Sequence, residues 1–360
     1  MTATSIRSKC RGPLASSVLI AAVAAAPAFA HHSFAKFDRD RTIELEGQIT
    51  EVFWQNPHIR FTLEGGEAGQ PARTWHLETN SPGILRRVGL TADSVAVGDR
   101  VLVAGNPTVN GAPDLNAINM LMPDGRELQL APGAPLHFAG RAVGDDSSWR
   151  VTAGDRSRPE LGLFRIWSSS FGSAPTLFPD SSGTDFTVLD YPLTPAARRA
   201  VENFDVVAGS EKLANDCTPK GMPWMMEQPY DLMFVRDRDN ILLKLEEFDI
   251  VRTIHMNWSG DRAAQAYSPA GFSTGRWDGP TLVVETTNLN SPNFKFEIPA
   301  SDEATISERF TPTPAGDRLD YEIVVTDPVT FTEPVRITKF WLSLTDQAFD
   351  AYNCGGPLSR

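Results

Sequence analysis

Apolar and polar residues alternate with a period of two along most of the chain, which is the pattern of half-buried β-strands. In the first 130 residues the pattern predicts five short strands, at residues 43–54, 59–63, 74–78, 97–105 and 117–121. One short helical stretch, residues 84–88, lies between the third and the fourth strand. Five strands with a single small helix at this place favour a small barrel of the oligonucleotide/oligosaccharide-binding (OB) type. That fold hosts unrelated functions and predicts none by itself.

The alternation returns in the second half, where turns separate the strands at hairpin spacing. The expected strands are residues 232–236, 241–246, 250–256, 272–277, 281–286, 305–312, 318–326 and 335–342. Asp278-Gly279 between two of them is a strong hairpin signal. About eight such strands would close into a barrel, because closure removes exposed edges. We therefore expect a mostly β protein, with an OB-like small barrel followed by a larger antiparallel, lipocalin-like barrel.

The segments between these patterns indicate the domain organisation. Residues 132–160 lack periodicity and are rich in Pro, Gly, Asp and Ser, so they are expected to form a linker. Residues 31–131 would form the OB-like domain and residues 161–360 the larger barrel. Before the barrel strands, Thr194 and Pro195 predict the cap and first turn of a helix that runs to about residue 204.

Residues 1–30 have the organisation of a secretory signal peptide. Positive charges at Arg7, Lys9 and Arg11 precede an apolar stretch, residues 14–26, and Ala28-Phe29-Ala30 matches a cleavage site. The alternative is a membrane anchor, but the apolar stretch is shorter than the roughly 20 residues that a span needs. We expect export to the periplasm and a mature chain that begins at His31, without membrane insertion after cleavage.

Charge and cysteine content narrow the expected partners. The chain has a net charge of −12, and removal of the signal peptide would take three basic residues and no acidic one. An acidic surface repels phosphate backbones, so nucleic acid is not an expected partner. Cys10 would leave with the signal peptide. Cys217 and Cys354 would remain, and in an oxidising compartment they either form a disulfide, which we expect, or stay as buried thiols.

Several motifs point to a family. The first half carries His31-His32-Ser33-Phe34-Ala35, Trp54-Gln55-Asn56-Pro57-His58 and Gly98-Asp99-Arg100-Val101. In this order they resemble the start of an uncharacterised family of exported bacterial proteins. The second half resembles a companion domain of equally obscure role, through Gly-Arg-Trp-Asp-Gly at residues 275–279 and Ser-Glu-Arg-Phe at residues 307–310. The resemblance implies export and a two-domain β arrangement, without a settled activity. His255 and Asn257 stand where the relatives tend to have Tyr and Asp, which points to a ligand of its own.

The first candidate chemistry is a copper or zinc site in the N-terminal half. A mature terminus at His31 would offer its amine and imidazole together, and His32, His58 and His76 belong to the same small domain. Imidazole suits both metals, and the α-amino group titrates near neutrality. The alternative is a solvated pair of histidines at the terminus, with His58 holding a turn and His76 on the outer face of a strand.

A second candidate lies inside the larger barrel. If Ile254 faces the core, Arg252 does too, and if Phe310 faces it, so does Glu308. A buried guanidinium and a buried carboxylate are costly unless paired, so we expect them to meet or to bind a polar ligand group. The alternative, which we favour, is a structural salt bridge.

A third candidate is a set of polar and aromatic residues around one hairpin. The catalytic candidates are His255, Glu308, Asp278 and Tyr267, and the candidate ligand contacts are Arg252, Asn257, Arg276, Trp277 and Glu285. A histidine near a carboxylate and a phenol could move protons on a bound molecule. The opposing interpretation takes His255 as packing, Asp278 as a turn residue and Trp277 as a plug of the barrel.

These observations favour a periplasmic protein that binds a small, partly apolar organic molecule in its C-terminal barrel, without a cofactor. One rival is a cofactor-free lyase, isomerase or dehydratase that uses His255 as general base, with Glu308 or Asp278 assisting. A second is a copper or zinc protein. The pattern does not decide between binding and turnover. The chain has no dinucleotide fingerprint, so nicotinamide chemistry is not expected.

Overall fold

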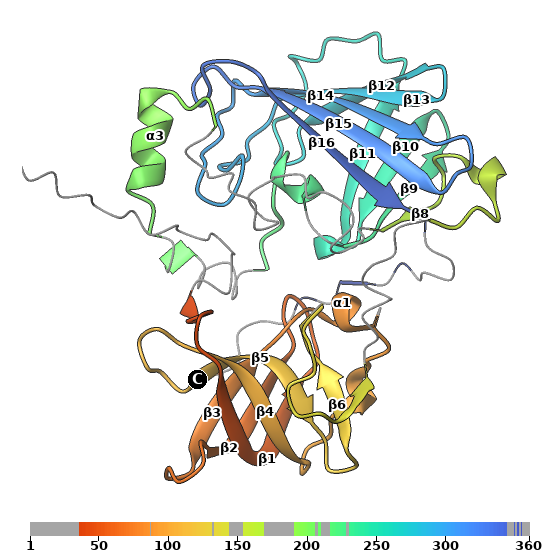
Figure 1. The fold of residues 1–360 in the computed structure, drawn as a ribbon. Helices are drawn as coiled ribbons and strands as arrows, with labels where there is room; N and C mark the ends of the chain where they lie inside the picture. Colours follow the sequence, from red (N-terminus) through yellow and green to blue (C-terminus); the bar gives the residue numbers. More distant parts are fainter. Residues whose placement is uncertain are drawn as a thin grey trace, which may run out of the picture.

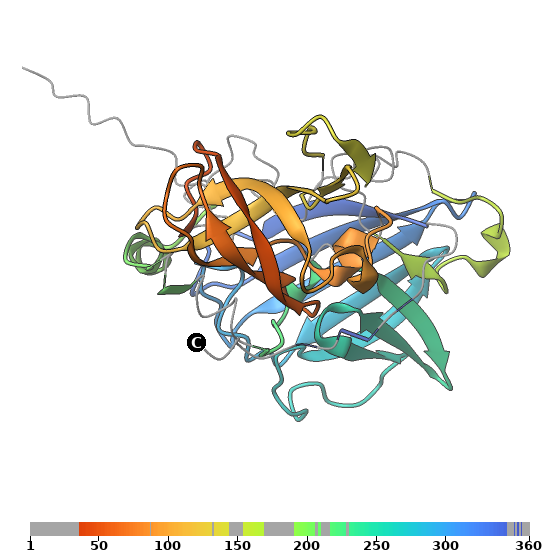
Figure 2. The ribbon, with the colours of Figure 1, turned by 90° about the horizontal axis from the view of Figure 1, so that it is seen from below.

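Two β-barrels make up the computed structural model (Figure 1). In Figure 1 they lie one above the other, and seen from below the first lies in front of the second (Figure 2). The structure describes residues 36–86, 88–131, 133–143, 154–168, 191–205, 208–209, 217–227, 230–343, 349, 351–352 and 354. The expected signal peptide, residues 1–30, lies outside the described residues, as do His31 and His32. Within the described ranges, no helix has the length and apolar character needed to cross a membrane.

The first barrel is closed and has five strands. They are β1 (Ile43–Phe53), β2 (Arg60–Gly66), β3 (Arg73–Glu78), β4 (Arg100–Pro107) and β5 (Asp114–Leu121). They pair in the order β3-β2-β1-β4-β5, and a parallel pairing of β3 with β5 closes the barrel. The short helix α1 (Pro82–Arg86) joins β3 to the 3-10 turn η2 (Ala92–Ser94) before β4. This is the OB-type arrangement expected from the strand spacing.

Period-two alternation builds the core of this barrel. Leu45 and Ile49 of β1, Leu63 of β2 and Leu77 of β3 are fully buried, and the residues on either side of Leu45 and of Ile49 are exposed. A side chain at Gly65 would collide with the backbone of Glu46 on the adjacent strand, so β1 and β2 approach closely there.

Two short strands extend the first sheet beyond β5. They are β6 (Arg126–Gln129) and β7 (Arg141–Val143), and β7 lies within the segment expected to be a linker. Glu127 holds this extension in place, because its fully buried carboxylate accepts hydrogen bonds from the backbone N–H groups of His137, Phe138 and Gly140. These bonds compensate for its burial and lower the pKa of Glu127. Local carboxylate-to-backbone bonding of this kind leaves no hydrophobic signature in the sequence.

The second barrel has nine strands and is nearly closed. They are β8 (Ile166–Trp167), β9 (Leu232–Asp237), β10 (Asn240–Leu245), β11 (Ile250–Met256), β12 (Phe272–Asp278), β13 (Thr281–Thr287), β14 (Thr305–Pro312), β15 (Arg318–Thr326) and β16 (Val335–Leu342). Each pairs with its neighbour in sequence. Ser168, directly after β8, exchanges two backbone hydrogen bonds of 2.9 Å with Leu342 at the end of β16. That bridge brings the two edge strands together.

One pair of strands differs from the antiparallel arrangement that we expected. β11 and β12 run parallel, pairing Ile254 with Ser273 and Met256 with Gly275. Parallel neighbours cannot be joined by a hairpin, and residues 257–271 form the longer crossing connection. The expectation was wrong here because alternation reports which face a side chain takes, and not the direction of the strand.

Helix α3 and the hairpin between β12 and β13 follow their sequence signals. α3 (Pro195–Glu202) has Pro195 in its first turn, and the Thr194 side chain accepts a hydrogen bond of 3.2 Å from the Ala197 backbone. Asp278 pairs with Thr281, so the hairpin loop consists of Gly279, whose φ is 59°, and Pro280. The remaining helical turns are η3 (Pro159–Leu161), η6 (Trp224–Met226) and η7 (Glu247–Asp249).

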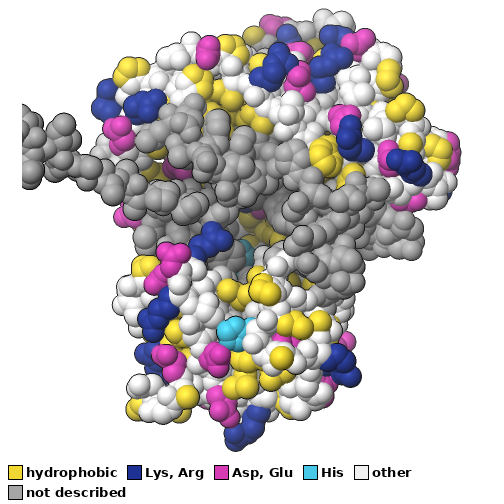
Figure 3. All heavy atoms as spheres, viewed as in Figure 1, with side chains coloured by type: hydrophobic (Ala, Val, Ile, Leu, Met, Phe, Trp, Pro, Cys, Tyr) yellow, Lys and Arg dark blue, Asp and Glu magenta, His cyan; other side chains and the backbone are white. Residues whose placement is uncertain are grey.

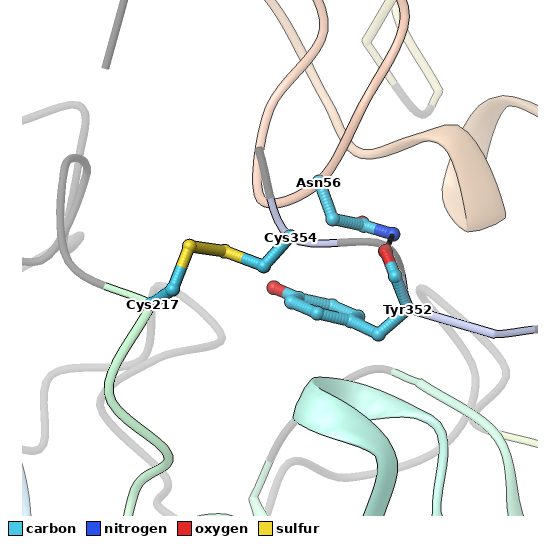
Figure 4. Close-up of a disulfide and its surroundings, with 4 residues drawn as sticks. All are labelled: Asn56, Cys217, Tyr352 and Cys354. Carbon is cyan, nitrogen blue, oxygen red and sulfur yellow. Dashed lines mark hydrogen bonds between the residues drawn. A yellow bond between two sulfur atoms is a disulfide. The ribbon is translucent and has the colours of Figure 1, made fainter. Parts of the chain in front are cut away.

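The C-terminal segment connects the two barrels (Figure 4). Cys217 and Cys354 form the expected disulfide. Next to it, Asn56 of the first barrel forms a β-bridge with Cys354, and its side-chain amide donates a hydrogen bond to the Tyr352 carbonyl. The disulfide therefore holds a segment of the chain that also contacts the first barrel.

Candidate functional site at the junction of the barrels

Arg252 and Glu308 meet inside the second barrel. The guanidinium contacts both carboxylate oxygens of Glu308, with Nη1 at 3.0 Å from Oε1. It also donates from Nε to Ser273 Oγ at 2.8 Å and from Nη2 to Thr286 Oγ1 at 2.6 Å, and Nη1 lies 3.7 Å from the sulfur of Met222. Burial works against the charged guanidinium, but the attraction of Glu308 outweighs it and raises the pKa of Arg252.

This network uses the whole hydrogen-bonding capacity of the guanidinium. Arginine has five N–H donors, and the five contacts above account for all of them. Glu308 Oε1 also accepts a hydrogen bond of 2.8 Å from the hydroxyl of Tyr321. Because both charged groups are satisfied by the protein, the geometry favours a structural salt bridge over a ligand contact.

His255 lies on the outer face of the second barrel. Its strand neighbours Arg252 and Ile254 are buried inside, and the alternation of β11 turns His255 the other way. The imidazole stacks on Phe272 with ring centroids 4.7 Å apart, and Trp258 lies 5.5 Å away. This cluster of three rings is an aromatic patch on the outside of the barrel.

The other residues of the predicted set are dispersed. Tyr267 is 54% exposed in the connection between β11 and β12. Asp278 forms an exposed ion pair of 3.0 Å with Arg309. Trp277 contacts Phe164, with ring centroids 6.3 Å apart. No contact recorded among the described residues joins His255 to Tyr267, Asp278 or Glu308.

The remaining candidate ligand contacts also face outward or act through the backbone. Arg276 and Glu285 are exposed, and the Glu285 carboxylate accepts a hydrogen bond of 3.0 Å from Ser307. Asn257 has a φ of 53° at the end of β11, and its backbone N–H donates to the Gly275 carbonyl at 2.9 Å.

Two of the four candidate metal ligands can be located. His58 Nδ1 lies 2.7 Å from Glu78 Oε1, and Lys36 Nζ lies 3.3 Å from Glu78 Oε2. His76 is exposed on β3, two residues before Glu78. Glu78 is buried, which favours the neutral acid, but His58 and Lys36 together lower the pKa of its carboxyl. Within the described ranges, no three His, Cys, Asp or Glu side chains are grouped closely enough to hold a metal ion.

A different cluster of titratable groups lies where the barrels meet. Glu246 and Glu247 follow β10 and are 4% and 3% exposed, and Asp231, just before β9, is 1% exposed. Lys220 Nζ forms an ion pair of 2.6 Å with Glu247 Oε1. Asp231 Oδ1 accepts a hydrogen bond of 2.6 Å from the Ser168 hydroxyl.

Helix α1 of the first barrel packs against this cluster. Arg86 Nη2 lies 3.8 Å from Glu246 Oε1, and a Cβ added to Gly83 would lie 3.0 Å from the same oxygen. The same added Cβ would lie 4.0 Å from Cδ1 of Tyr230 in the second barrel. The acidic end of the second barrel is therefore covered by the first.

Strained backbone lies next to these carboxylates. Phe248 and Asp249 in η7 have φ of 57° and 52°, a region that residues with side chains rarely adopt. The C-terminal segment supports this conformation, because the Tyr352 backbone N–H donates to Asp249 Oδ1 at 3.1 Å and the Tyr352 ring lies 4.7 Å from Phe248. Such strain costs of the order of 1–3 kcal/mol per residue and is found most often at functional sites.

A small pocket opens within the cluster. Its lining combines four apolar side chains with four that carry polar atoms: Met225, Met226, Leu232, Leu245, Tyr230, Asp231, Glu247 and Trp341. Its volume is about 10 Å³, close to the roughly 10–15 Å³ that one water needs. Burial, followed by the charge of Glu247, raises the pKa of Tyr230, so its phenol stays neutral.

Two buried polar atoms of the pocket residues stand out. Glu247 Oε2 and Trp341 Nε1 have no hydrogen-bond partner within the part of the chain that the structure describes. Burial raises the pKa of Glu247, and the nearby Lys220 ammonium opposes this only in part. A carboxyl with a raised pKa beside a specific charge partner is typical of functional sites.

The sequence signal for this junction is weak. Glu246 was expected to be the last residue of a strand, and Glu247 stands in a polar run between two strands. Three acids within residues 246–249, between two strongly apolar strands, are the only local sign. Their burial depends on α1, which is more than 150 positions away in the sequence.

The fold and the junction define a class: a two-barrel β protein with a buried acidic cluster between an OB-type barrel and a larger one. A model of a family of unknown function, DUF6152, matches residues 19–115. This match covers most of the five-stranded barrel and supports kinship with an uncharacterised family. The second barrel lies outside it.

Two further comparisons add little. A solved structure of a protein of unknown function from the DUF3598 family of Nostoc punctiforme is 10% identical and covers 83% of this chain and 95% of its own. The TM-score is 0.18, which is too low to carry an argument. No curated protein matches the chain.

Proposed function

We propose that this is a periplasmic protein that binds a small, partly apolar organic molecule at the end of the second barrel that faces the first. The observation that supports this most is the pair of unpartnered atoms, Glu247 Oε2 and Trp341 Nε1, on residues that line one pocket. A buried polar group without a hydrogen bond costs about 1–3 kcal/mol. A ligand that supplies those bonds would remove this cost, and the apolar side chains would contact its body.

The pocket must enlarge to hold more than a polar head. Met225 and Met226 are the side chains best suited to this, because methionine is unbranched and has several accessible rotamers. Arg252 and Glu308, which the sequence suggested as ligand contacts, would instead stabilise the barrel behind the site. The site therefore belongs to the barrel mouth rather than to its interior.

A periplasmic location and a small-molecule partner are proposed from the signal-like segment and from the charge of the chain. The signal-like segment, residues 1–30, supports a periplasmic location. Acidic and basic side chains are interspersed over the described part of the face in Figure 3, and the chain is acidic overall. Both features favour a small organic ligand over nucleic acid as partner.

Turnover is a second candidate, and Glu247 supports it better than His255 does. Burial raises the pKa of the Glu247 carboxyl, and Lys220 Nζ lies 2.6 Å from its Oε1, so this carboxyl is placed to exchange a proton with a bound molecule. A lyase, isomerase or dehydratase would then use Glu247, with no cofactor. His255, on the outer face, would not take part.

Copper or zinc binding remains a separate proposal for the first barrel. Lys36 supports it, because this residue places the start of the expected mature chain close to Glu78 and His58. Lys36 contacts Glu78, and Glu78 contacts His58 Nδ1. When a histidine binds a metal through one ring nitrogen, the other ring nitrogen commonly contacts a carboxylate, as His58 Nδ1 contacts Glu78 here. His31 is five residues before Lys36, and five residues span at most about 18 Å. The terminal amine, His31 and His32 would therefore be within reach of His58, with His76 on the same strand as Glu78.

Native mass spectrometry of the exported, processed protein tests these proposals together. We expect an added mass of a small organic molecule, which should disappear in Leu245→Phe, where the larger side chain fills the pocket. Val251→Phe, on the exposed outer face, is the matched control and should keep the adduct. His255→Ala should keep it too. A stoichiometric copper or zinc mass would instead support the metal proposal, and it should be lost when one residue is added before His31.

The proposal of organic ligand binding would be rejected by a folded wild-type protein that carries no organic adduct and binds no small molecule in a thermal-shift screen. An adduct that Leu245→Phe keeps would place the ligand elsewhere.

A further inference from the structure

We infer that the polar head of the ligand is a hydroxyl group, so that the site selects alcohols. In this arrangement the hydroxyl oxygen accepts a hydrogen bond from Trp341 Nε1 and its O–H donates to Glu247 Oε2. The inference rests on the proposed function, because it names the ligand class of the same site.

The donor and acceptor properties of the two unpartnered atoms lead to this class. Indole Nε1–H only donates, and the oxygens of a carboxylate only accept. The Lys220 ammonium, 2.6 Å from Glu247 Oε1, stabilises the carboxylate form of Glu247. The other oxygen of Glu247 is already engaged, since Oε1 lies 2.6 Å from Lys220 Nζ. A head group that satisfies both remaining atoms must accept one hydrogen bond and donate one. A hydroxyl does both with a single oxygen.

Ammonium, carboxylate and ether head groups each satisfy only one of the two atoms. An ammonium has three donors and no acceptor, so it would leave Trp341 Nε1 without a partner. A carboxylate or an ether oxygen has no hydrogen to donate to Glu247. A carboxylate would also bring a second negative charge beside Glu247, in a cluster that already contains Asp231 and Glu246.

Size and surroundings separate an alcohol from a free water. The pocket of about 10 Å³ accepts a group of water size, which excludes bulkier anionic heads such as phosphate. A buried water typically makes about three hydrogen bonds. Asp231 Oδ1 is already engaged by the Ser168 hydroxyl. An alcohol oxygen fits this site better than a water does. It needs only the two hydrogen bonds to Glu247 and Trp341, and its carbon chain would contact the apolar side chains of the pocket, Met225, Met226, Leu232 and Leu245.

The test compares probes of equal length and different head: 1-hexanol, hexylammonium, hexanoate and methyl pentyl ether, titrated into the processed protein by calorimetry. We expect 1-hexanol to bind at least about tenfold more tightly than each of the others, which corresponds to one hydrogen bond to a buried group. Trp341→Phe keeps an aromatic side chain and removes the N–H, and should weaken 1-hexanol binding about tenfold while leaving hexylammonium binding unchanged. Trp258→Phe, on the outer aromatic patch, is the matched control and should change neither.

Each outcome separates the two claims. Hexylammonium or hexanoate binding as tightly as 1-hexanol, with binding lost in Leu245→Phe, would overturn the hydroxyl inference and leave the proposed function standing. Binding of no probe, together with no organic adduct in the native mass spectrum, would overturn both. If Trp341→Phe does not fold, Glu247→Gln supplies the second variant. Its amide can donate as well as accept, so the preference for 1-hexanol over hexanoate should shrink.

Discussion

At the scale of single residues, a buried charged side chain is stabilised when all its polar atoms have hydrogen-bond partners. Arg252 meets this condition through Glu308, Ser273, Thr286 and Met222. Glu247 does not, because one carboxylate oxygen is paired with Lys220 and the other has no partner in the described chain. This difference decides which of the two buried acids is structural and which is a candidate for ligand binding.

Removing one member of the buried Arg252–Glu308 pair should strongly destabilise the protein. We expect Arg252→Met to lower the free energy of unfolding by about 3–5 kcal/mol, because it leaves the Glu308 charge buried and unpaired. The double variant Arg252→Met/Glu308→Leu should recover part of that loss. Denaturant unfolding followed by fluorescence measures both. Arg309→Met, which breaks the exposed pair with Asp278, is the control and should cost at most about 1 kcal/mol. Equal losses in the buried and exposed variants would contradict this account.

The inward position of Arg252 and Glu308 could be predicted, and the same reasoning explains what was missed. Parity along a strand shows which residues share a face, so Ile254 inward means Arg252 inward and His255 outward. Grouping His255 with Glu308 ignored that parity. The neighbours of Glu247 could not be predicted, because they come from α1 and from the C-terminal segment, and no short-range pattern encodes such contacts.

At the scale of elements, the positions of the strands follow closely from the alternation of apolar and polar residues, whereas the direction of each strand does not. The expected strand at residues 335–342 is β16 with the same bounds, and Thr194 caps α3 as its sequence signal indicated. The parallel pairing of β11 and β12 depends on how residues 257–271 cross the barrel. That crossing is a tertiary choice, which alternation cannot report.

Glu78, the last residue of β3, contacts His58 in the turn before β2. We expect this carboxyl to make the free energy of unfolding depend on pH in the acid range. The pKa of Glu78 is lowered in the folded protein, so at low pH the unfolded state takes up a proton more readily than the folded state. The contribution of Glu78 to stability is therefore fully present above its unfolded pKa of about 4.3 and is lost as the pH falls through the lower folded value. Thermal unfolding of wild type and Glu78→Gln between pH 7 and pH 3 measures this. The stability difference should shrink as the pH drops, and a constant difference would show that Glu78 acts through packing alone.

At the scale of the whole molecule, the two barrels are connected by polar contacts and one covalent bond. Asn56 contacts the C-terminal segment, and Arg86 lies near Glu246. Interfaces of this polar kind permit relative motion of domains unless another constraint opposes it. The Cys217–Cys354 disulfide supplies that constraint, because Cys354 itself pairs with Asn56.

Removal of this disulfide should therefore change both stability and cooperativity. The bond joins residues 137 positions apart, and loss of a disulfide that closes a long loop costs about 2–5 kcal/mol. In Cys217→Ser/Cys354→Ser we expect the second barrel to unfold at a lower temperature. The five-stranded barrel should keep its own transition, because its core does not include the C-terminal segment. In scanning calorimetry we expect two transitions for this variant and one for the oxidised protein. Asn56→Ala separates the two effects, since it removes the side-chain hydrogen bond to Tyr352 and keeps the covalent bond. It should split the transitions without the full loss of stability, and a single transition in both variants would mean that other junction contacts alone couple the barrels.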